Sequence, residues 1–98
     1  MKVTWSPLAE EQVAECFAYI AAERPSAAIR WFDGLVDKTN SLSILPDQGR
    51  MVPEAQRPSL REVLVGAYRV VYRRGEDEVI VLSVQRERRD LDVDAFEP

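Results

Sequence analysis

The last third of the chain constrains its fold most, because it contains three strand-like runs separated by very short turns. The runs are residues 60–65, 68–73 and 78–85, and the turns between them contain Gly66 and Gly75. Strands joined by such short connections pair antiparallel, since a parallel pair needs a long crossover connection. The run 78–85 is the most apolar of the three, which is typical of a buried central strand. We therefore predict a three-stranded antiparallel meander in this part of the chain.

The first half of the chain predicts a short strand followed by two helices. Polar and apolar residues alternate over 2–5, as expected of a strand with one buried face. Apolar residues then recur at helical spacing over 7–23 and over 26–43. Ser6 precedes the first helix and Ser26 opens the second, and serine is a favourable N-cap residue. The connection between the helices is short, so we expect an antiparallel helical hairpin.

These elements define an α+β chain with the order β-α-α-β-β-β. We expect the N-terminal strand to pair with an edge of the antiparallel sheet and the helical hairpin to cover one face of that sheet. A length of 98 residues fits one domain spanning 1–98, with an acidic C-terminal tail over about 90–98. Residues 46–58 contain three prolines and form a stiff loop of a length that is often functional.

The composition excludes several kinds of catalytic and metal site. The chain has no histidine, so it cannot contain a Ser-His-Asp triad, a histidine metal cluster or an imidazole base. Cys16 is the only cysteine, which excludes an internal disulfide and a cysteine-rich zinc site, and its place on the apolar side of the first helix predicts a core position. Since phosphate loops, dinucleotide fingerprints and EF-hand ligand sets are also missing from the sequence, we expect neither a metal nor a cofactor.

Two further features bear on location. The longest apolar runs are much shorter than the ~20 residues that a membrane helix needs. The N-terminal residues also lack the apolar core of a signal peptide. We therefore expect a cytoplasmic location and no membrane partner.

Charge is unevenly distributed along this chain of net charge −4. Residues 1–56 carry a net −3, residues 57–89 a net +3, and residues 90–98 a net −4. An acidic chain has no general electrostatic attraction to nucleic acid. Every positive charge after residue 38 is an arginine, which suits bidentate recognition of carboxylate or phosphate better than lysine does. A solvated set of arginines beside the strands is the alternative interpretation.

The arginines form the main candidate for a site that binds or stabilises a phosphoryl group. Arg61 and Arg69 fall on neighbouring predicted strands and could lie close together. A cluster of this kind would stabilise charge on a phosphoryl group without a base. The members of the candidate cluster are Arg50, Arg61, Arg69, Arg86 and Arg89.

Ion pairing is the alternative to a phosphate site, with Glu54, Glu62, Glu78 and Glu87 as partners. Glu54 or Glu62 could in principle act as a general base. Nearby arginines, however, lower the pKa of a carboxyl group and make it a poor base at neutral pH, so structural ion pairs are favoured. The tail 90–96 alternates acidic and apolar residues, and it could fold back on the basic sheet, bind a partner or fray.

Several short motifs occur along the chain in a characteristic order and spacing. They are residues 3–9, Tyr19-Ile20, 25–28, 45–50, Arg61-Glu62, 68–72 and 79–84. Together they resemble the RelE/ParE superfamily of small toxins from bacterial toxin–antitoxin pairs. The resemblance covers nearly the whole chain and agrees with the β-α-α-β-β-β order derived above.

Within that superfamily, the chain is more similar to the ParE branch than to the RelE branch. RelE-like members cut mRNA on the ribosome, are usually strongly basic and carry catalytic side chains on the sheet, whereas ParE-like members inhibit DNA gyrase and lack that set. The segment 49–54 followed by Arg61-Glu62 is typical of the ParE branch, and Gln85 stands where many relatives have histidine. The resemblance thus implies a type II toxin that inhibits gyrase by binding rather than by catalysis.

Two alternatives remain open. One is a RelE-like, ribosome-dependent mRNA endonuclease in which arginines hold the phosphate. The other is a non-toxic homologue retained for partner binding. If the chain were a nuclease, the phosphate-holding residues would be Arg50, Arg61, Arg69 and Arg86.

The resemblance also implies a partner. Toxins of this superfamily are commonly neutralised by an antitoxin whose C-terminal segment wraps the toxin, and the antitoxin rather than the toxin binds operator DNA. A groove between the helical hairpin and the sheet would suit an acidic or amphipathic segment that meets the sheet arginines. The residues predicted to bind partners are Arg50, Arg61, Glu62, Tyr68, Arg69, Gln85, Arg86 and Arg89.

Overall fold

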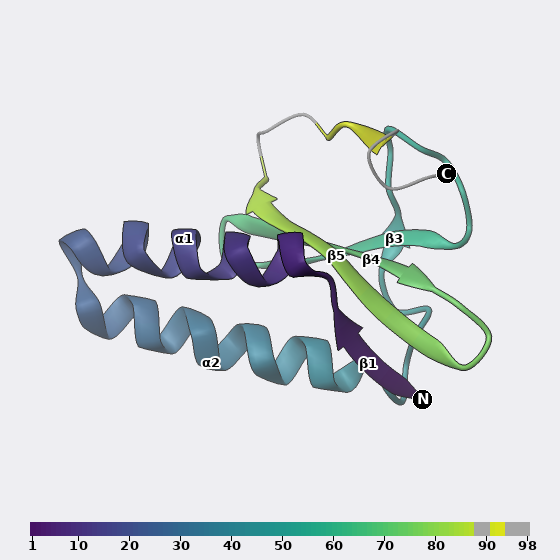
Figure 1. Ribbon diagram of the computed structural model, residues 1–98, viewed down its shortest axis with the longest axis horizontal. Coiled ribbons are helices and arrows are strands. Elements are labelled where there is room, and N and C mark those ends of the chain that lie inside the picture. The colour runs from purple at the N-terminus through teal and green to yellow at the C-terminus, as the bar shows by residue number, and fades with distance from the viewer. Residues whose placement is uncertain (88–90, 94–98) are drawn as a thin grey trace.

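The computed structural model describes residues 1–87 and 91–93, and it shows an α+β fold with a five-stranded sheet and a helical hairpin (Figure 1). The predicted order of strand, two helices and meander is confirmed, and one short strand is added to it. The elements are β1 Lys2–Trp5, α1 Pro7–Glu23, α2 Pro25–Ser41, β2 Arg50–Met51, β3 Leu60–Val65, β4 Tyr68–Arg74 and β5 Glu78–Arg86.

The strands lie in the order β1-β5-β4-β3-β2. The three C-terminal strands form the predicted antiparallel meander, and β1 occupies an edge as predicted. Because β1 runs parallel to β5, the sheet is mixed rather than purely antiparallel. Strand β2, inside the segment predicted as a loop, pairs with β3 at the other edge. Addition of a strand at each edge makes β4 the middle strand, while β5 is interior but not central.

Each of these two helices begins at a proline that follows its N-cap residue. The Ser6 hydroxyl accepts a hydrogen bond from the Ala9 amide at 3.0 Å, which confirms the predicted N-cap of α1. The second helix begins at Pro25, and its N-cap is Arg24, so the prediction that Ser26 caps it is wrong. Proline fits the first helical position because its missing N–H would be unpaired there anyway. Only Arg24 separates the helices, and they lie side by side as an antiparallel pair (Figure 1).

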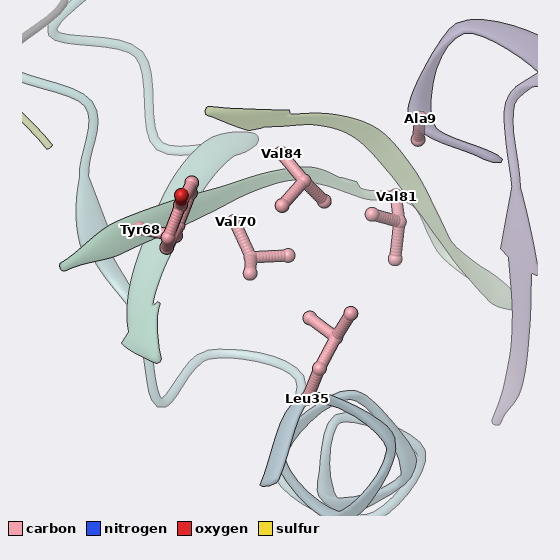
Figure 2. Packing of buried hydrophobic residues seen from close by; sticks show 6 residues of the cluster. All are labelled: Ala9, Leu35, Tyr68, Val70, Val81 and Val84. Carbon is pink, nitrogen blue, oxygen red and sulfur yellow. The ribbon is translucent and has the colours of Figure 1, made fainter. Parts of the chain in front are cut away.

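The helical hairpin covers one face of the sheet and forms the larger core with it. Half-buried residues of the helices, including Val13, Cys16, Ile20 and Trp31, pack against this core, which confirms the core position predicted for Cys16. Figure 2 shows side chains from the sheet strands and from both helices converging in this space. The buried residues are Ala9, Leu35, Tyr68, Val70, Val81 and Val84.

The second face of the sheet carries a smaller apolar core that no helix of the described chain covers. Its buried residues are Val52, Leu60, Val71, Leu82 and Leu91. The loop after β2 and residues 91–93 close it, so the described part of the predicted acidic tail folds back on the sheet. Residues 88–90 and 94–98 lie outside the described part of the chain.

Both described helices are too short or too polar to cross a membrane.

Candidate functional site

A network of ion pairs lies on the second face of the sheet, beside the smaller core. The carboxylate of Glu62, on β3, is fully buried and binds two arginines. Its Oε2 accepts hydrogen bonds from Arg50 Nη2 at 2.8 Å and Nε at 3.0 Å, and its Oε1 accepts one from Arg69 Nη1 at 2.9 Å. The strand pairing explains this arrangement, because Arg50 on β2 lies directly opposite Glu62.

Glu54 is the fourth member of this arginine–carboxylate network, which comprises Arg50, Glu54, Glu62 and Arg69. Glu54 Oε2 lies 2.5 Å from Arg69 Nη2 and also accepts a hydrogen bond from the Leu91 amide at 3.2 Å. Glu54 thereby connects the loop after β2 to β4 and to the C-terminal segment. The hydrogen bond from Arg69 lowers the pKa of Glu54 from 4.5 to about 2, despite the opposing effect of burial.

The network favours structural ion pairs over acid–base chemistry. The two glutamates form the ion pairs that the sequence predicted for them. A carboxyl group with a pKa of about 2 is ionised at neutral pH and is a very weak base. The hydrogen bonds that Arg69 donates to Glu54 also raise the pKa of Arg69, so the arginine stays charged and two carboxylates neutralise it.

Arg61 does not join this network. On β3 it lies opposite Tyr72, whereas Arg69 on β4 lies opposite Leu64. Side chains alternate between the faces of a strand, so positions 61 and 64 point to opposite faces, and so do Arg61 and Arg69. The prediction that these two arginines lie close together is therefore wrong.

Arg61 instead holds the loop that leads into β2. Its Nη1 donates to the Gly49 carbonyl at 2.8 Å and its Nε donates to the Pro58 carbonyl at 2.9 Å. On the same side, the Tyr72 hydroxyl accepts from the Gly49 amide at 3.0 Å and donates to the Pro46 carbonyl at 2.8 Å. A Cβ atom at Gly49 would lie 2.7 Å from that hydroxyl, so only glycine fits there. These contacts fix the strand that presents Arg50.

A pocket of about 310 Å³ opens on the helix-covered side, between α1 and the ends of β4 and β5. We call it the tyrosine pocket. Arg86 lies over the ring of Tyr19, with its guanidinium carbon 5.3 Å from the ring centre, and its Nη1 lies 3.2 Å from the Tyr19 hydroxyl. The lining residues are Gln12, Glu15, Cys16, Tyr19, Tyr68, Val84, Gln85 and Arg86.

A second depression, of about 480 Å³, adjoins the tyrosine pocket and shares Tyr19, Tyr68 and Arg86 with it. Together the two depressions form a groove between the helical hairpin and the sheet, where the sequence predicted one. Tyr19 is 63% exposed and was not among the predicted partner-binding residues. One feature of the sequence could have identified Tyr19 as a binding residue. It is an aromatic residue on the predicted helix that falls outside the apolar row expected to pack on the sheet.

The predicted partner-binding residues thus divide among separate places. Arg50, Glu62 and Arg69 meet in the arginine–carboxylate network. Three others, Tyr68, Gln85 and Arg86, line the tyrosine pocket, and Arg61 lies in neither. Arg89 lies outside the described residues. Within residues 1–87 and 91–93, no three acidic or cysteine side chains are grouped in a way that could hold a metal.

Comparison with known proteins agrees with this architecture. A solved structure described as the chromosomal ParDE TA system from P. aeruginosa has the same fold, with a TM-score of 0.73 and 18% sequence identity. The match covers 88% of this chain and 95% of that chain. Residues 3–91 match the family described as the ParE toxin of type II toxin-antitoxin system, parDE. No curated protein matches the sequence significantly.

The family match, together with the shared fold, identifies a small α+β protein of the RelE/ParE superfamily, as the sequence motifs predicted. The family match covers nearly the whole chain. The chain therefore belongs to the ParE toxins of type II toxin–antitoxin systems.

Proposed function

We propose that this chain is a toxin that inhibits DNA gyrase by binding it, and that a cognate antitoxin neutralises the chain. The family match over residues 3–91 is the observation that carries this proposal, because a toxin of a toxin–antitoxin family has an antitoxin as its partner. The arginine–carboxylate network supports action by binding rather than by RNA cleavage. Its carboxylates are engaged with arginines, and the pKa of Glu54 is about 2.

The tyrosine pocket is the proposed docking site of the antitoxin segment. Its walls offer the exposed ring of Tyr19 to apolar side chains and the guanidinium of Arg86 to a carboxylate. An amphipathic segment with an acidic residue satisfies both requirements at once. Operator DNA would then be bound by the antitoxin.

Two assays run side by side test the proposed activity. The purified chain is added to gyrase in a DNA supercoiling assay, and its induction in bacteria is followed by primer extension on translated mRNA. Blocked supercoiling with intact mRNA supports the proposal. Cleavage within codons would replace it with the RelE-type alternative, and growth without arrest from a folded chain would indicate a non-toxic homologue.

Charge reversal tests the antitoxin site. Arg86→Glu should weaken binding of the antitoxin encoded beside this chain by about 10-fold or more, since a charge-assisted contact becomes a repulsive one. Arg30→Glu makes the same change at an exposed position of α2, outside the pocket, and should leave the affinity unchanged. Equal effects of the two variants would contradict docking in the tyrosine pocket.

A further inference from the structure

Strand β2 is held firmly in the sheet although it buries neither of its side chains. It has only two residues, Arg50 and Met51, and both are exposed. The residue before it is fixed at both its backbone groups, because the Gly49 amide donates to the hydroxyl of the fully buried Tyr72 and its carbonyl accepts from Arg61. A strand that adds no side chain to a core gains little stability from burial. We therefore attribute these contacts to the placement of Arg50.

Buried charge orients the guanidinium of Arg50. Its Nε and Nη2 both donate to Oε2 of Glu62, whose side chain is fully buried, while Oε1 of Glu62 accepts from Arg69. Burial of a carboxylate with a guanidinium is costly, and well-packed apolar residues in their place often stabilise a fold equally well or better. Stability alone does not explain such a network. The network does give Arg50 one fixed orientation, as supporting hydrogen bonds do around a binding site.

The same guanidinium keeps donors for a further partner. The Arg50 side chain is 66% exposed. Glu62 accepts from Nε and Nη2, and within residues 1–87 and 91–93 the Nη1 group has no hydrogen-bond partner. Nη1 and Nη2 form the outer fork of a guanidinium, which binds both oxygens of a carboxylate or phosphate. Because its orientation is already fixed, Arg50 loses less conformational freedom on binding than an ordinary surface arginine does.

An exposed leucine adjoins this arginine on the same face of the sheet. Arg50 lies directly opposite Glu62, and Leu64 follows Glu62 by two positions on β3, so the side chains of all three point to one face. Leu64 is 45% exposed. A fixed guanidinium beside an exposed leucine is complementary to an acidic side chain that has an apolar neighbour.

We propose that Arg50 and Leu64 form the contact through which the chain binds its target, with Arg50 receiving an acidic side chain of the target and Leu64 an apolar one. This inference rests on the proposed function, under which the target is a surface of gyrase. Arginines with a fixed geometry are common among the residues that dominate the binding energy of protein interfaces. The contact lies on the sheet face without helices, whereas the tyrosine pocket opens on the helix-covered side, so the target and the antitoxin segment are assigned different surfaces.

A phosphate of nucleic acid would fit the same fork, but the surroundings of Arg50 disfavour it. Binding to a nucleic-acid backbone normally requires several uncompensated cations. Arg69, the nearest second arginine of the network, is neutralised by Glu54 and Glu62, and the whole chain has a net charge of −4. A sugar–phosphate backbone also offers no apolar side chain to Leu64. The observations therefore favour a carboxylate of a protein.

Inhibition of gyrase by full-length variants tests the role of Arg50. The concentration that half-inhibits DNA supercoiling should rise about 10-fold or more in both Arg50→Met and Arg50→Lys, because lysine keeps the charge but lacks the fork. Arg57→Met removes an exposed arginine from the loop after β2 and should leave inhibition unchanged. Val81→Ala controls for lost stability, since it removes buried methyl groups from the helix-covered core, and it should also inhibit normally.

A pair of leucine variants tests the apolar half of the contact. Leu64→Ser should raise the half-inhibiting concentration about 3- to 10-fold, because an apolar contact with the target is lost. Leu45→Ser makes the same change at a side chain that is 59% exposed and lies after α2, and it should have no effect. An equal effect of the two variants would contradict a specific contact at Leu64.

Glu62 is a positioning residue in this proposal, and a substitution that keeps its shape tests that role. Glu62→Gln removes the charge that holds Arg50. Exchange of the Arg50 Nε proton with water, followed by NMR, should become at least about 3-fold faster, and inhibition should weaken with it. Faster exchange with full inhibition would contradict the positioning role. The Arg50 variants keep the proposal falsifiable if this buried change prevents folding.

The outcomes separate this inference from the proposed function. If the unaltered chain inhibits gyrase and both Arg50 variants inhibit it equally well, the inference is wrong and the proposed function stands. If the unaltered chain does not inhibit gyrase, both are wrong. Binding of the chain to duplex DNA alone, abolished by Arg50→Met, would assign the arginine to a phosphate group instead of a protein carboxylate.

Discussion

The arginine–carboxylate network permits a sharp test of how this fold is stabilised. The perturbation is Arg69→Met, which keeps much of the side-chain volume and removes the charge. The side chains of Arg69 and Glu62 are 5% and 0% exposed, so the variant leaves a buried carboxylate with only the solvent-facing Arg50. Removal of one partner from a buried pair costs about 3–5 kcal/mol in free energy of unfolding.

For a domain of this size, a loss of that magnitude is a large part of the total stability, which is typically about 5–15 kcal/mol. The corresponding fall in Tm is roughly 15–30 °C. Urea denaturation followed by circular dichroism measures the free energy directly. The matched control is Arg50→Met, which removes a hydrogen-bond partner of the same carboxylate. The Arg50 side chain is 66% exposed and Arg69 still compensates the charge of Glu62, so the loss should be smaller, about 1–2 kcal/mol for the hydrogen bonds removed from the buried carboxylate.

A second substitution distinguishes lost charge compensation from lost packing. Addition of Glu62→Gln to Arg69→Met removes the uncompensated buried charge, and it should recover part of the stability. Lost packing would not be recovered in this way. The reasoning is refuted if Arg69→Met and Arg50→Met destabilise the chain equally, or if the double variant is less stable than Arg69→Met alone.

Three further predictions follow from the same region. The folded-state pKa of Glu54, about 2, lies below its ordinary value of 4.5, so the stability it contributes is present above pH 4.5 and is lost as the pH falls toward 2. Glu54→Gln should flatten this part of the stability profile by about 1–2 kcal/mol, and an unchanged profile would contradict that role. Gly49→Ala should cost about 1–3 kcal/mol because its Cβ would lie 2.7 Å from the Tyr72 hydroxyl, whereas the control Gly34→Ala meets its neighbour at an ordinary 3.7 Å and should be neutral or stabilising in thermal denaturation. Leu91→Ala should lower the free energy of unfolding by about 2 kcal/mol, and a loss near zero would show that residues 91–93 do not close the second core.

Periodicity was sufficient to predict the helices and the meander, because each of these elements is recorded in local spacing. The limits of α1 and the antiparallel order of β3, β4 and β5 are as predicted. Strand β2 was missed because two residues are too few to show alternation. Its pairing with β3 depends instead on the loop contacts made by Arg61 and Tyr72.

The register across the sheet was the information that the sequence did not supply. A shift of one residue moves a side chain to the other face, so neighbouring strands alone cannot show which arginines meet. The pairing of β4 with β5 contains such a shift in register. Val71 pairs with Ser83 and Tyr72 with Val81, which leaves Leu82 as the extra residue of a bulge. Val81 and Val84, although three residues apart, consequently both face the helix-covered core, while Leu82 lies with Ile80 on the second core.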